Sequence, residues 1–260
     1  MTTSRRSASR PTLPPAVHNR HAWDRQSDAY DRRFEPILGG PYARAWGLWR
    51  IPESRARWLG PVRGRRILEV GCGAGRWAIA LRRAGARVVG IDQSGAQLSK
   101  ANRLARGARV RVPLVCANAE RLPFRDGHFD LAFCDWGALS FSDPERSIPE
   151  CARVLRRGGR LVFVTGTLLS LLTLDRRADH FSRRLRTPYF GPLRREVGNM
   201  FEYRPSAGEW IEIFAASGLV VEHLSETRPR PGDRSRYLAE RDERWAHRFP
   251  AEMVWQVRKP

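Results

Sequence analysis

Three glycines at two-residue spacing, Gly71, Gly73 and Gly75, follow an apolar stretch that contains one acid, Glu69. Such a turn, placed between a strand and a helix, lets a ligand approach bare backbone N–H groups at the helix N-terminus. The dinucleotide pattern G-x-G-x-x-G requires a glycine at position 76, where this chain has Arg76. The spacing therefore argues against a diphosphate cradle and favours a ligand with an amino-acid portion and a ribose, although such glycines can also serve the turn alone.

A second acid, Asp92, ends the next predicted strand in the stretch GIDQS. A carboxylate there can accept hydrogen bonds from both hydroxyls of a ribose, and it can equally cap a helix. Two further stretches follow at the ends of later strands, CANAERLPF at 116–124 and FDLAFCDWGAL at 129–139. Because the carboxyl ends of parallel strands meet at one edge of a sheet, these stretches predict a single ligand site there.

Strands and helices alternate along the chain after Gly64, which predicts a doubly wound α/β sheet. Strands are predicted over 66–70, 87–91, 110–116, 129–135, 160–165, 219–224 and 252–258, and helices over 75–83, 94–106 and 206–216. Within 144–157, Ser147 and Glu150 form a possible capping box, which would place Pro149 in the first turn of a helix, where its missing N–H does no harm. This run is therefore predicted to form two short helical pieces rather than one helix.

The domain organisation follows from composition. Residues 1–20 are rich in Ser, Arg and Pro and are predicted to be a disordered tail, and residues 21–60 are predicted to form an aromatic helical cap, broken at 39–41. Residues 61–260 form the catalytic-type domain, in which the segments 168–205 and 227–250 lack sheet periodicity. We interpret these two segments as insertions that build a lid over an acceptor pocket.

Charge and cysteine content limit the classes of function. The net charge is +20, from 47 basic and 27 acidic residues, but all basic residues except Lys100 and Lys259 are arginine. This bias is typical of GC-rich coding sequences, so solvated arginines are favoured over a dedicated polyanion surface. The four cysteines show neither a CxxC pair nor metal-ligand spacing, which argues against a metal site and favours a reducing cytoplasm. Since no apolar run reaches membrane-helix length, we expect a soluble protein.

Taken together, these stretches resemble the class I S-adenosylmethionine-dependent methyltransferases, especially the small-molecule group that includes ubiquinone and menaquinone C-methyltransferases. The resemblance covers about residues 66–166, and a weaker similarity extends to AWDRQSDAY at 22–30 and FPAEMVWQVRK at 249–259. It implies a Rossmann-like seven-stranded sheet whose last strand is antiparallel, and S-adenosylmethionine as the cofactor.

The resemblance also implies roles for individual residues. Gly71, Cys72 and Gly73 would lie against the methionine portion of the cofactor, with Glu69 steadying the loop and Gly75 completing it. Asp92 would hold the ribose, and Gln93 lies beside it in the sequence. Where the family usually has an acid for the adenine amino group, this chain has Asn118, followed by Ala119; Asp135 and Trp136 would face the sulfonium.

The sequence says less about the methyl acceptor than about the cofactor. CDWG at 134–137 lacks the Asp/Asn-Pro-Pro-aromatic pattern of enzymes that methylate exocyclic amines of bases, so a small-molecule acceptor is favoured. Seven arginines between 176 and 195, interleaved with aromatic residues, keep an RNA methyltransferase open. A non-catalytic S-adenosylmethionine-binding protein also stays open, as does a nicotinamide-dependent oxidoreductase despite the absent third glycine. If a general base is used, the candidates are His180, His21 and Tyr203.

Overall fold

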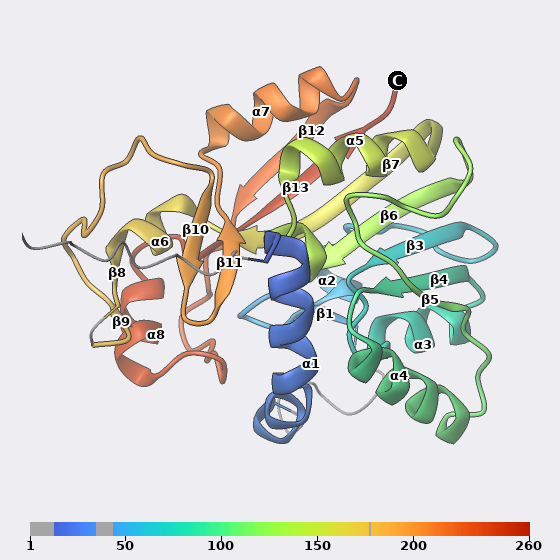
Figure 1. Cartoon of the computed structure of the whole chain (residues 1–260), viewed down its shortest axis with the longest axis horizontal. Helices are drawn as coiled ribbons and strands as arrows, with labels where there is room; N and C mark the ends of the chain where they lie inside the picture. The colour runs from blue at the N-terminus through green and yellow to red at the C-terminus, as the bar shows by residue number, and fades with distance from the viewer. Residues whose placement is uncertain (1–12, 35–43, 177) are drawn as a thin grey trace, which may run out of the picture.

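The computed structural model describes residues 13–34, 44–176 and 178–260, and its centre is one seven-stranded sheet (Figure 1). In spatial order the strands are β12 (Val220–Glu226), β13 (Glu252–Arg258), β7 (Leu155–Gly166), β6 (Phe129–Asp135), β3 (Arg66–Val70), β4 (Arg87–Asp92) and β5 (Leu114–Cys116). β13 is antiparallel to both of its neighbours, whereas the other neighbouring pairs are parallel. The doubly wound sheet and its antiparallel last strand are therefore confirmed.

Two helical layers cover the sheet, because successive strand residues point to opposite faces. Leu68 of β3 belongs to a core shared with α5 (Pro144–Val154) and α7 (Ala207–Ala216). The neighbouring Ile67 belongs to the opposite core, shared with α3 (Arg76–Arg83). The helix α4 (Gly95–Gly107) packs beside α3 and begins at Ser94, whose hydroxyl accepts a hydrogen bond from the Gln97 N–H. Both faces are thus apolar, as strands of a parallel sheet require.

The helix α5 differs from the sequence prediction, because Pro149 lies inside one continuous helix. Asp143 caps this helix by accepting a hydrogen bond from the Glu145 N–H. Ser147 is buried, and Glu150 accepts a hydrogen bond from the Leu122 N–H and one from Arg153 instead of closing a capping box. The predicted division into two pieces is wrong, since core packing holds the helix together and Pro149 sits on its exposed side, where water can reach the freed carbonyl.

The N-terminal part contains a longer helix than predicted. The helix α1 (Pro15–Phe34) begins inside the segment predicted to be disordered, so that prediction is wrong for residues 15–20, while residues 1–12 lie outside the described part. Asn19 explains the order of this helix start, because its side chain donates to the carbonyl oxygens of Phe141 and Phe201. The predicted break at 39–41 also lies outside the described residues. The cap then continues as a small hairpin, β1 (Ala45–Trp46) with β2 (Ile51–Pro52), and the short α2 (Glu53–Ala56).

The two segments interpreted as insertions contain regular structure of their own. The first holds α6 (Leu168–Thr173) and two antiparallel pairs, β8 (Leu174–Asp175) with β9 (His180–Phe181) and β10 (Arg194–Val197) with β11 (Met200–Tyr203). The second holds α8 (Glu240–Ala246). Figure 1 shows both on the left of the sheet, beyond the end of β7. Across the described residues, no helix combines the length and the apolar character needed to cross a bilayer.

Candidate functional site

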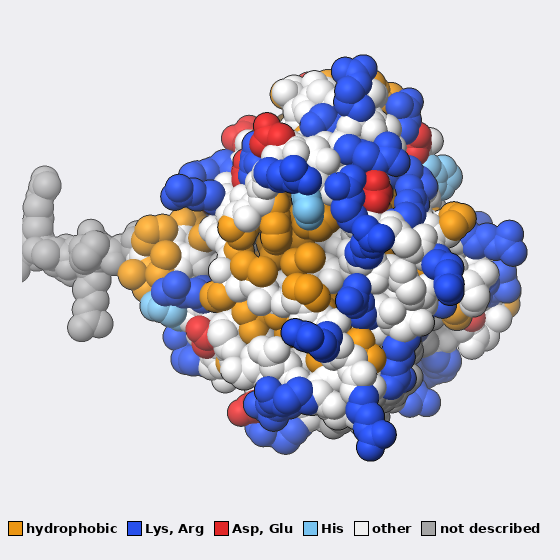
Figure 2. Space-filling view, turned by 90° about the vertical axis from the view of Figure 1, so that its right-hand side faces the viewer, with side chains coloured by type: hydrophobic (Ala, Val, Ile, Leu, Met, Phe, Trp, Pro, Cys, Tyr) orange, Lys and Arg blue, Asp and Glu red, His pale blue; other side chains and the backbone are white. Residues whose placement is uncertain are grey.

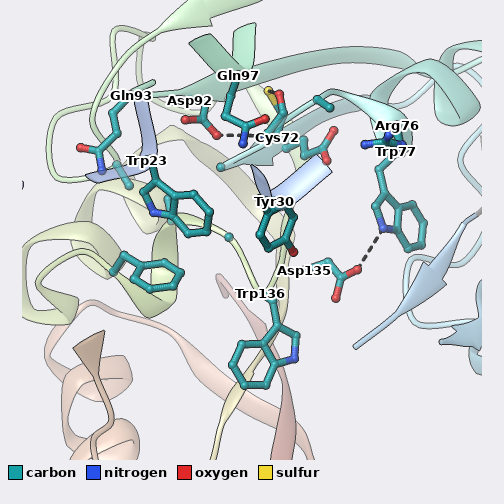
Figure 3. A pocket seen from close by; sticks show the side chains of 18 of the residues that line it. Trp23, Tyr30, Cys72, Arg76, Trp77, Asp92, Gln93, Gln97, Asp135 and Trp136 are labelled. Atoms are coloured by element: carbon teal, nitrogen blue, oxygen red, sulfur yellow. Dashed lines mark hydrogen bonds between the residues drawn. The ribbon is translucent and has the colours of Figure 1, made fainter. Parts of the chain in front are cut away.

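A cavity of about 350 Å³ lies at the carboxyl ends of β3, β4 and β6. The helix α1 covers it: in Figure 3, Trp23 and Tyr30 of this helix lie between Asp92 above and Trp136 below. A pocket of this size falls in the range of small-molecule sites, and its place at the strand ends is the one expected in a doubly wound sheet. Ten of the eleven residues predicted for the cofactor line it: Glu69, Gly71, Cys72, Gly73, Asp92, Gln93, Asn118, Ala119, Asp135 and Trp136.

Each of the three positions is occupied by glycine for a different structural reason. All have positive φ, 78° at Gly71, 50° at Gly73 and 70° at Gly75. A side chain at Gly71 would overlap the backbone N of Ala138, so the turn must stay bare for the β3 and β6 ends to meet. At Gly73 the nearest atom to an added Cβ is Gln97 Oε1, 3.8 Å away, so the space beside it is open pocket.

Gly75 is the eleventh predicted residue, and the structure does not place it in the pocket wall. Its backbone forms the N-cap of α3. A Cβ at this position would lie 3.0 Å from the Cβ of Ala101 on α4. Its small size therefore serves the packing of α3 against α4, and the prediction that Gly75 contacts the cofactor finds no support in the geometry.

Asp92 lies at the end of β4 and joins two turns. Its Oδ2 accepts a hydrogen bond from the Gly73 N–H at 2.9 Å, and its Oδ1 accepts one from the Ser94 N–H at 2.9 Å. Burial raises the pKa of this carboxyl, and the backbone hydrogen bonds oppose that rise. Each oxygen keeps a free lone pair in this arrangement, so Asp92 can accept further hydrogen bonds from a ligand.

Glu69 contributes a buried acid to the same pocket, with a backbone hydrogen bond from Ala78 and one oxygen that is unsatisfied. Its side chain is buried, and its Oε2 has no hydrogen-bond partner among the described residues. Burial raises the pKa of Glu69 well above its ordinary value, and the nearby Asp135 and Asp92 raise it further. A buried carboxyl that lacks a partner is costly, and a bound cation or hydrogen-bond donor would remove that cost.

Asp135 and Trp136 end β6 beneath α1. Asp135 accepts hydrogen bonds from the Gly47 N–H at 2.9 Å and from the Trp77 Nε1–H at 3.1 Å, the second of which is drawn in Figure 3. Trp136 has a φ of 50°, and its Nε1–H donates to Glu252 Oε2 at 2.7 Å. A non-glycine residue at positive φ is strained, so the Glu252 bond helps to hold Trp136 in the pocket wall.

Aromatic rings close the pocket on the side of α1. Trp23 packs edge-on against Tyr30, with ring centroids 5.6 Å apart, and against Phe141, at 5.3 Å. Asn118 lines the opposite region and accepts the Glu120 N–H with its Oδ1 at 3.0 Å. The result is one cavity lined by both acids and aromatic rings.

This arrangement can be set beside known proteins. Residues 68–163 match the family model described as a methyltransferase domain. The chain is 37% identical over 140 residues to a demethylmenaquinone methyltransferase of Clavibacter sepedonicus, an alignment that covers 54% of each protein. The chain therefore contains a methyltransferase domain over residues 68–163, and this domain is similar to those of the class I S-adenosylmethionine-dependent methyltransferases.

A second sequence relative and a solved structure are also similar to this chain. An uncharacterized protein of Mycobacterium bovis is 31% identical over 197 residues, which cover 70% of this chain and 64% of that protein. A crystal structure of the geranyl diphosphate C-methyltransferase from Streptomyces coelicolor has a TM-score of 0.66 at 18% identity, and the match covers 95% of this chain and 100% of that one. The second likeness shows the fold. The chain spans between about half and two thirds of the length of these sequence relatives.

The three predicted bases of this methyltransferase do not line the pocket. His180 is buried in β9 beside α8, and His21 contacts Arg20 on α1. Tyr203 is buried at the end of β11, and burial raises the pKa of its hydroxyl. Cys72 does line the pocket, but burial raises its thiol pKa well above the ordinary value, which fits the prediction of a small buried filler rather than a nucleophile.

Several lining residues escaped the sequence prediction. They come from the cap hairpin, the first turns of α3 and α4, the segment after β6 and the two insertions, and include Gly47, Leu48, Arg50, Arg76, Trp77, Gln97, Phe141, Ser142, Glu202 and Tyr237. Only the aromatic content of the cap signalled part of this set. Of the insertions, Glu202 and Tyr237 reach the pocket, whereas no described residue of the arginine-rich run 176–195 does. The lid interpretation therefore stays a prediction, and the described residues of that run give it no support.

Arginines are spread widely over the molecule. Figure 2 shows one face, turned away from the insertions, on which Lys and Arg side chains are scattered with few acidic ones between them. Net charge alone therefore does not mark a binding surface in this methyltransferase.

Proposed function

We propose that the chain transfers a methyl group from S-adenosylmethionine to a small, largely apolar acceptor bound under α1. The observation that carries the proposal is a single cavity that combines buried acids, among them Glu69 with an Oε2 that lacks a partner among the described residues, with aromatic rings. A cationic sulfonium with an ammonium group matches the first, and an apolar acceptor ring matches the second.

The residues present suit the cofactor. Asp92 would accept hydrogen bonds from the ribose hydroxyls, and the bare backbone at Gly71 and Gly73 would admit the methionine portion. That portion carries both charges, and the pocket supplies partners for both: Glu69 for the ammonium and Arg50 for the carboxylate. Asn118 and Ala119 would meet the adenine, with an amide oxygen in place of the family's carboxylate.

The protein would contribute to the reaction by positioning the cofactor and the acceptor and by excluding water from the cavity. The cofactor, when bound, would supply a methyl group on a sulfonium; the acceptor would attack the methyl carbon in line as the carbon–sulfur bond breaks, and S-adenosylhomocysteine would leave as a neutral thioether. Trp23, Tyr30, Phe141 and Trp136 exclude water and hold the acceptor in attack geometry. Since none of the proposed bases reaches the cavity, we propose an acceptor that arrives with its nucleophilic atom already deprotonated, or one that loses its proton to solvent or a pocket acid.

The nature of the acceptor follows from the ring-lined wall. Relatives named for demethylmenaquinone and for ubiquinone biosynthesis favour a quinone-like aromatic acceptor for this chain. An RNA acceptor is not favoured, because the arginine-rich run lies outside the pocket. The four cysteines are free, which fits reaction in the cytoplasm.

The proposal is tested by incubating the protein with methyl-labelled S-adenosylmethionine and a cell extract, then separating lipids, small polar molecules, RNA and protein. Label in an organic-soluble small molecule is the expected result. Label on RNA would overturn the small-molecule assignment. Cofactor binding by calorimetry without transfer to any fraction would favour a binding protein, and binding of NAD(P)H in its place would favour an oxidoreductase.

Asp92→Asn tests the ribose contact. The change keeps the shape of the side chain and removes its charge, so the affinity for S-adenosylmethionine should fall about tenfold, or about 1.4 kcal/mol. Calorimetry with the purified protein measures this directly. Asp126→Asn, a change of the same kind at an exposed carboxylate, is the matched control. An Asp92→Asn affinity equal to that of the wild type would contradict the assignment.

A further inference from the structure

A surface away from the pocket combines the first insertion with the second. The loop between β9 and β10, residues 182–193, runs along the left-hand side of Figure 1 beside α8. The Phe181 N–H donates to Asp242 Oδ1 at 2.7 Å, and the Trp245 Nε1–H donates to the Ser182 carbonyl oxygen at 2.8 Å. We call residues 182–193 together with the exposed side chains of 241–248 the loop–α8 surface. These bonds fix the base of the loop to α8.

The loop exposes large apolar side chains. Leu185 is 58% exposed, Tyr189 50% and Phe190 89%, and Phe190 is the most exposed large apolar side chain in the described part of the chain. Tyr189 and Phe190 contact each other edge-on, with centroids 5.1 Å apart. Three such side chains within six residues form a patch, and none of them lines the cofactor cavity. A patch of this kind indicates an interaction site rather than random exposure.

Arginines gather at the base of the same loop, where it meets α8. A groove between the loop and α8 is lined by six of them: Arg183, Arg184, Arg186, Arg241, Arg244 and Arg248. Arg186 pairs with Asp175 and Arg244 with Glu240. For the other four, no carboxylate of the described residues lies within ion-pairing distance, and residues 180–195 contain no acid. Asp242 and Glu243 of α8 are buried and Glu243 pairs with Arg234, so the surface exposes an excess of positive charge, and the same loop exposes apolar side chains.

The aromatic residues of the groove bear on whether this surface fits RNA or an anionic lipid bilayer. Phe181 stacks on Trp245 at 4.5 Å, and Trp245 stacks on Phe249 at 5.2 Å. Trp245 is only 6% exposed, so its ring is not available for stacking on bases, and Phe181 and Phe249 beside it are half-buried. The side chains that do project outward include Leu185, an aliphatic residue that contributes nothing to base stacking. Exposed Leu, Tyr and Phe among arginines match a lipid interface instead.

We propose that the loop–α8 surface docks on an anionic lipid bilayer. Leu185, Tyr189 and Phe190 would enter the interface, and Arg183, Arg184, Arg241 and Arg248 would contact lipid phosphates. The two signals act together, since apolar insertion and attraction to anionic headgroups each give only weak binding alone. The proposal stands on this surface and does not depend on which acceptor the cavity takes.

Vesicle co-sedimentation with the full chain tests the proposal. The probes are vesicles of phosphatidylcholine alone and of phosphatidylcholine mixed with phosphatidylglycerol. Binding to the mixed vesicles only is expected, and binding should weaken as salt is added, because exposed charges are screened. No binding to the mixed vesicles, or equal binding to both kinds, would overturn the proposal.

Two variants and two matched controls locate the surface. Leu185→Ser with Phe190→Ser should lower the vesicle partition coefficient about tenfold, and replacing Arg183, Arg184, Arg241 and Arg248 by Gln should lower it at least as much. The apolar control is Ile211→Ser with Val220→Ser, which removes side chains of 49% and 48% exposure elsewhere. The charge control replaces Arg55, Arg87, Arg106 and Arg111, four exposed arginines outside this surface, by Gln. Both controls should partition like the wild type.

The variants should also bind S-adenosylmethionine with wild-type affinity, which shows that they are folded. Equal losses in the variants and their controls would overturn the proposal, because the effect would then be general. Loss in the arginine variant alone would overturn it too, since apolar insertion would play no part. Binding of single-stranded RNA that only the arginine variant loses would assign the surface to nucleic acid.

Discussion

Gly73→Val is expected to weaken S-adenosylmethionine binding by about 100-fold, or about 2.7 kcal/mol, while the domain stays folded. A side chain at Gly73 finds only Gln97 Oε1 near it, at 3.8 Å, so it projects into the open cavity. The added atoms therefore occupy space that we assign to the ligand, and they clash with nothing in the free protein. Calorimetric titration with the cofactor and a thermal unfolding curve measure the two effects separately.

The matched control is Gly64→Val. Gly64 also has a positive φ, 75°, and no atom lies within 4 Å of an added Cβ, but it is outside the cavity. Both substitutions carry the same backbone cost, because a β-branched residue is strained in the left-handed region. Only Gly73→Val should affect the cofactor. If both variants bind alike, the glycines serve the turn alone.

The part of the site that sequence could predict is local. The residues of the glycine turn and Asp92 are close in sequence to the strand ends they follow, so a strand pattern and a motif suffice to place them. The period of the apolar residues indicated the sheet for the same reason, and even its edge strands appeared within a few residues. Gly75 marks the limit, because the same motif that brings Gly71 to the ligand turns Gly75 toward Ala101.

The remainder depends on contacts between distant segments. Trp23, Glu202 and Tyr237 reach one cavity although Trp23 lies more than 170 residues before the other two in the chain, and no local pattern records that meeting. The order of residues 15–20 depends on Asn19 bonding to the carbonyl of Phe141, again a contact across the fold. The composition of residues 15–20 predicted disorder because composition alone does not record contacts with distant residues.

The arginine-rich run shows how the structure changes an interpretation. In sequence it follows the fifth strand, where a lid is reasonable, and its aromatic residues allow RNA. In the fold it turns away from the cavity and pairs with α8, which adds Arg241, Arg244 and Arg248 from a second segment. The function of these arginines is ambiguous in the sequence alone. Their neighbours in the fold make an interpretation possible.

The second large effect is expected from Glu252, whose ionisation should make the stability of the fold depend on pH. This carboxyl is completely buried, and burial raises its pKa to about 7, against hydrogen bonds from Leu48 and Trp136 that favour the charged form. In the unfolded chain the ordinary value is 4.5. Between these values the folded protein retains a proton that the unfolded chain has lost. Stability from this group is therefore full below about pH 4.5 and is lost as pH rises through about 7.

Glu252→Gln removes this titration and keeps an oxygen for the Leu48 and Trp136 donors. The free energy of unfolding of the wild type should fall by roughly 3 kcal/mol more than that of the variant between about pH 4.5 and pH 8. Urea titrations at a series of pH values measure this difference. Glu240→Gln, which removes an exposed carboxylate of α8, is the matched control for the change in charge.

The comparison separates Glu252 from the other buried acids. Burial also raises the pKa of Glu69, Asp92 and Asp135, so both proteins should lose stability toward neutral pH, and only the difference between them belongs to Glu252. Identical pH profiles for wild type and variant would show that Glu252 ionises as easily in the fold as in the unfolded chain. Because Glu252 fixes Trp136 in the pocket wall, its protonation also links pH to the shape of the site.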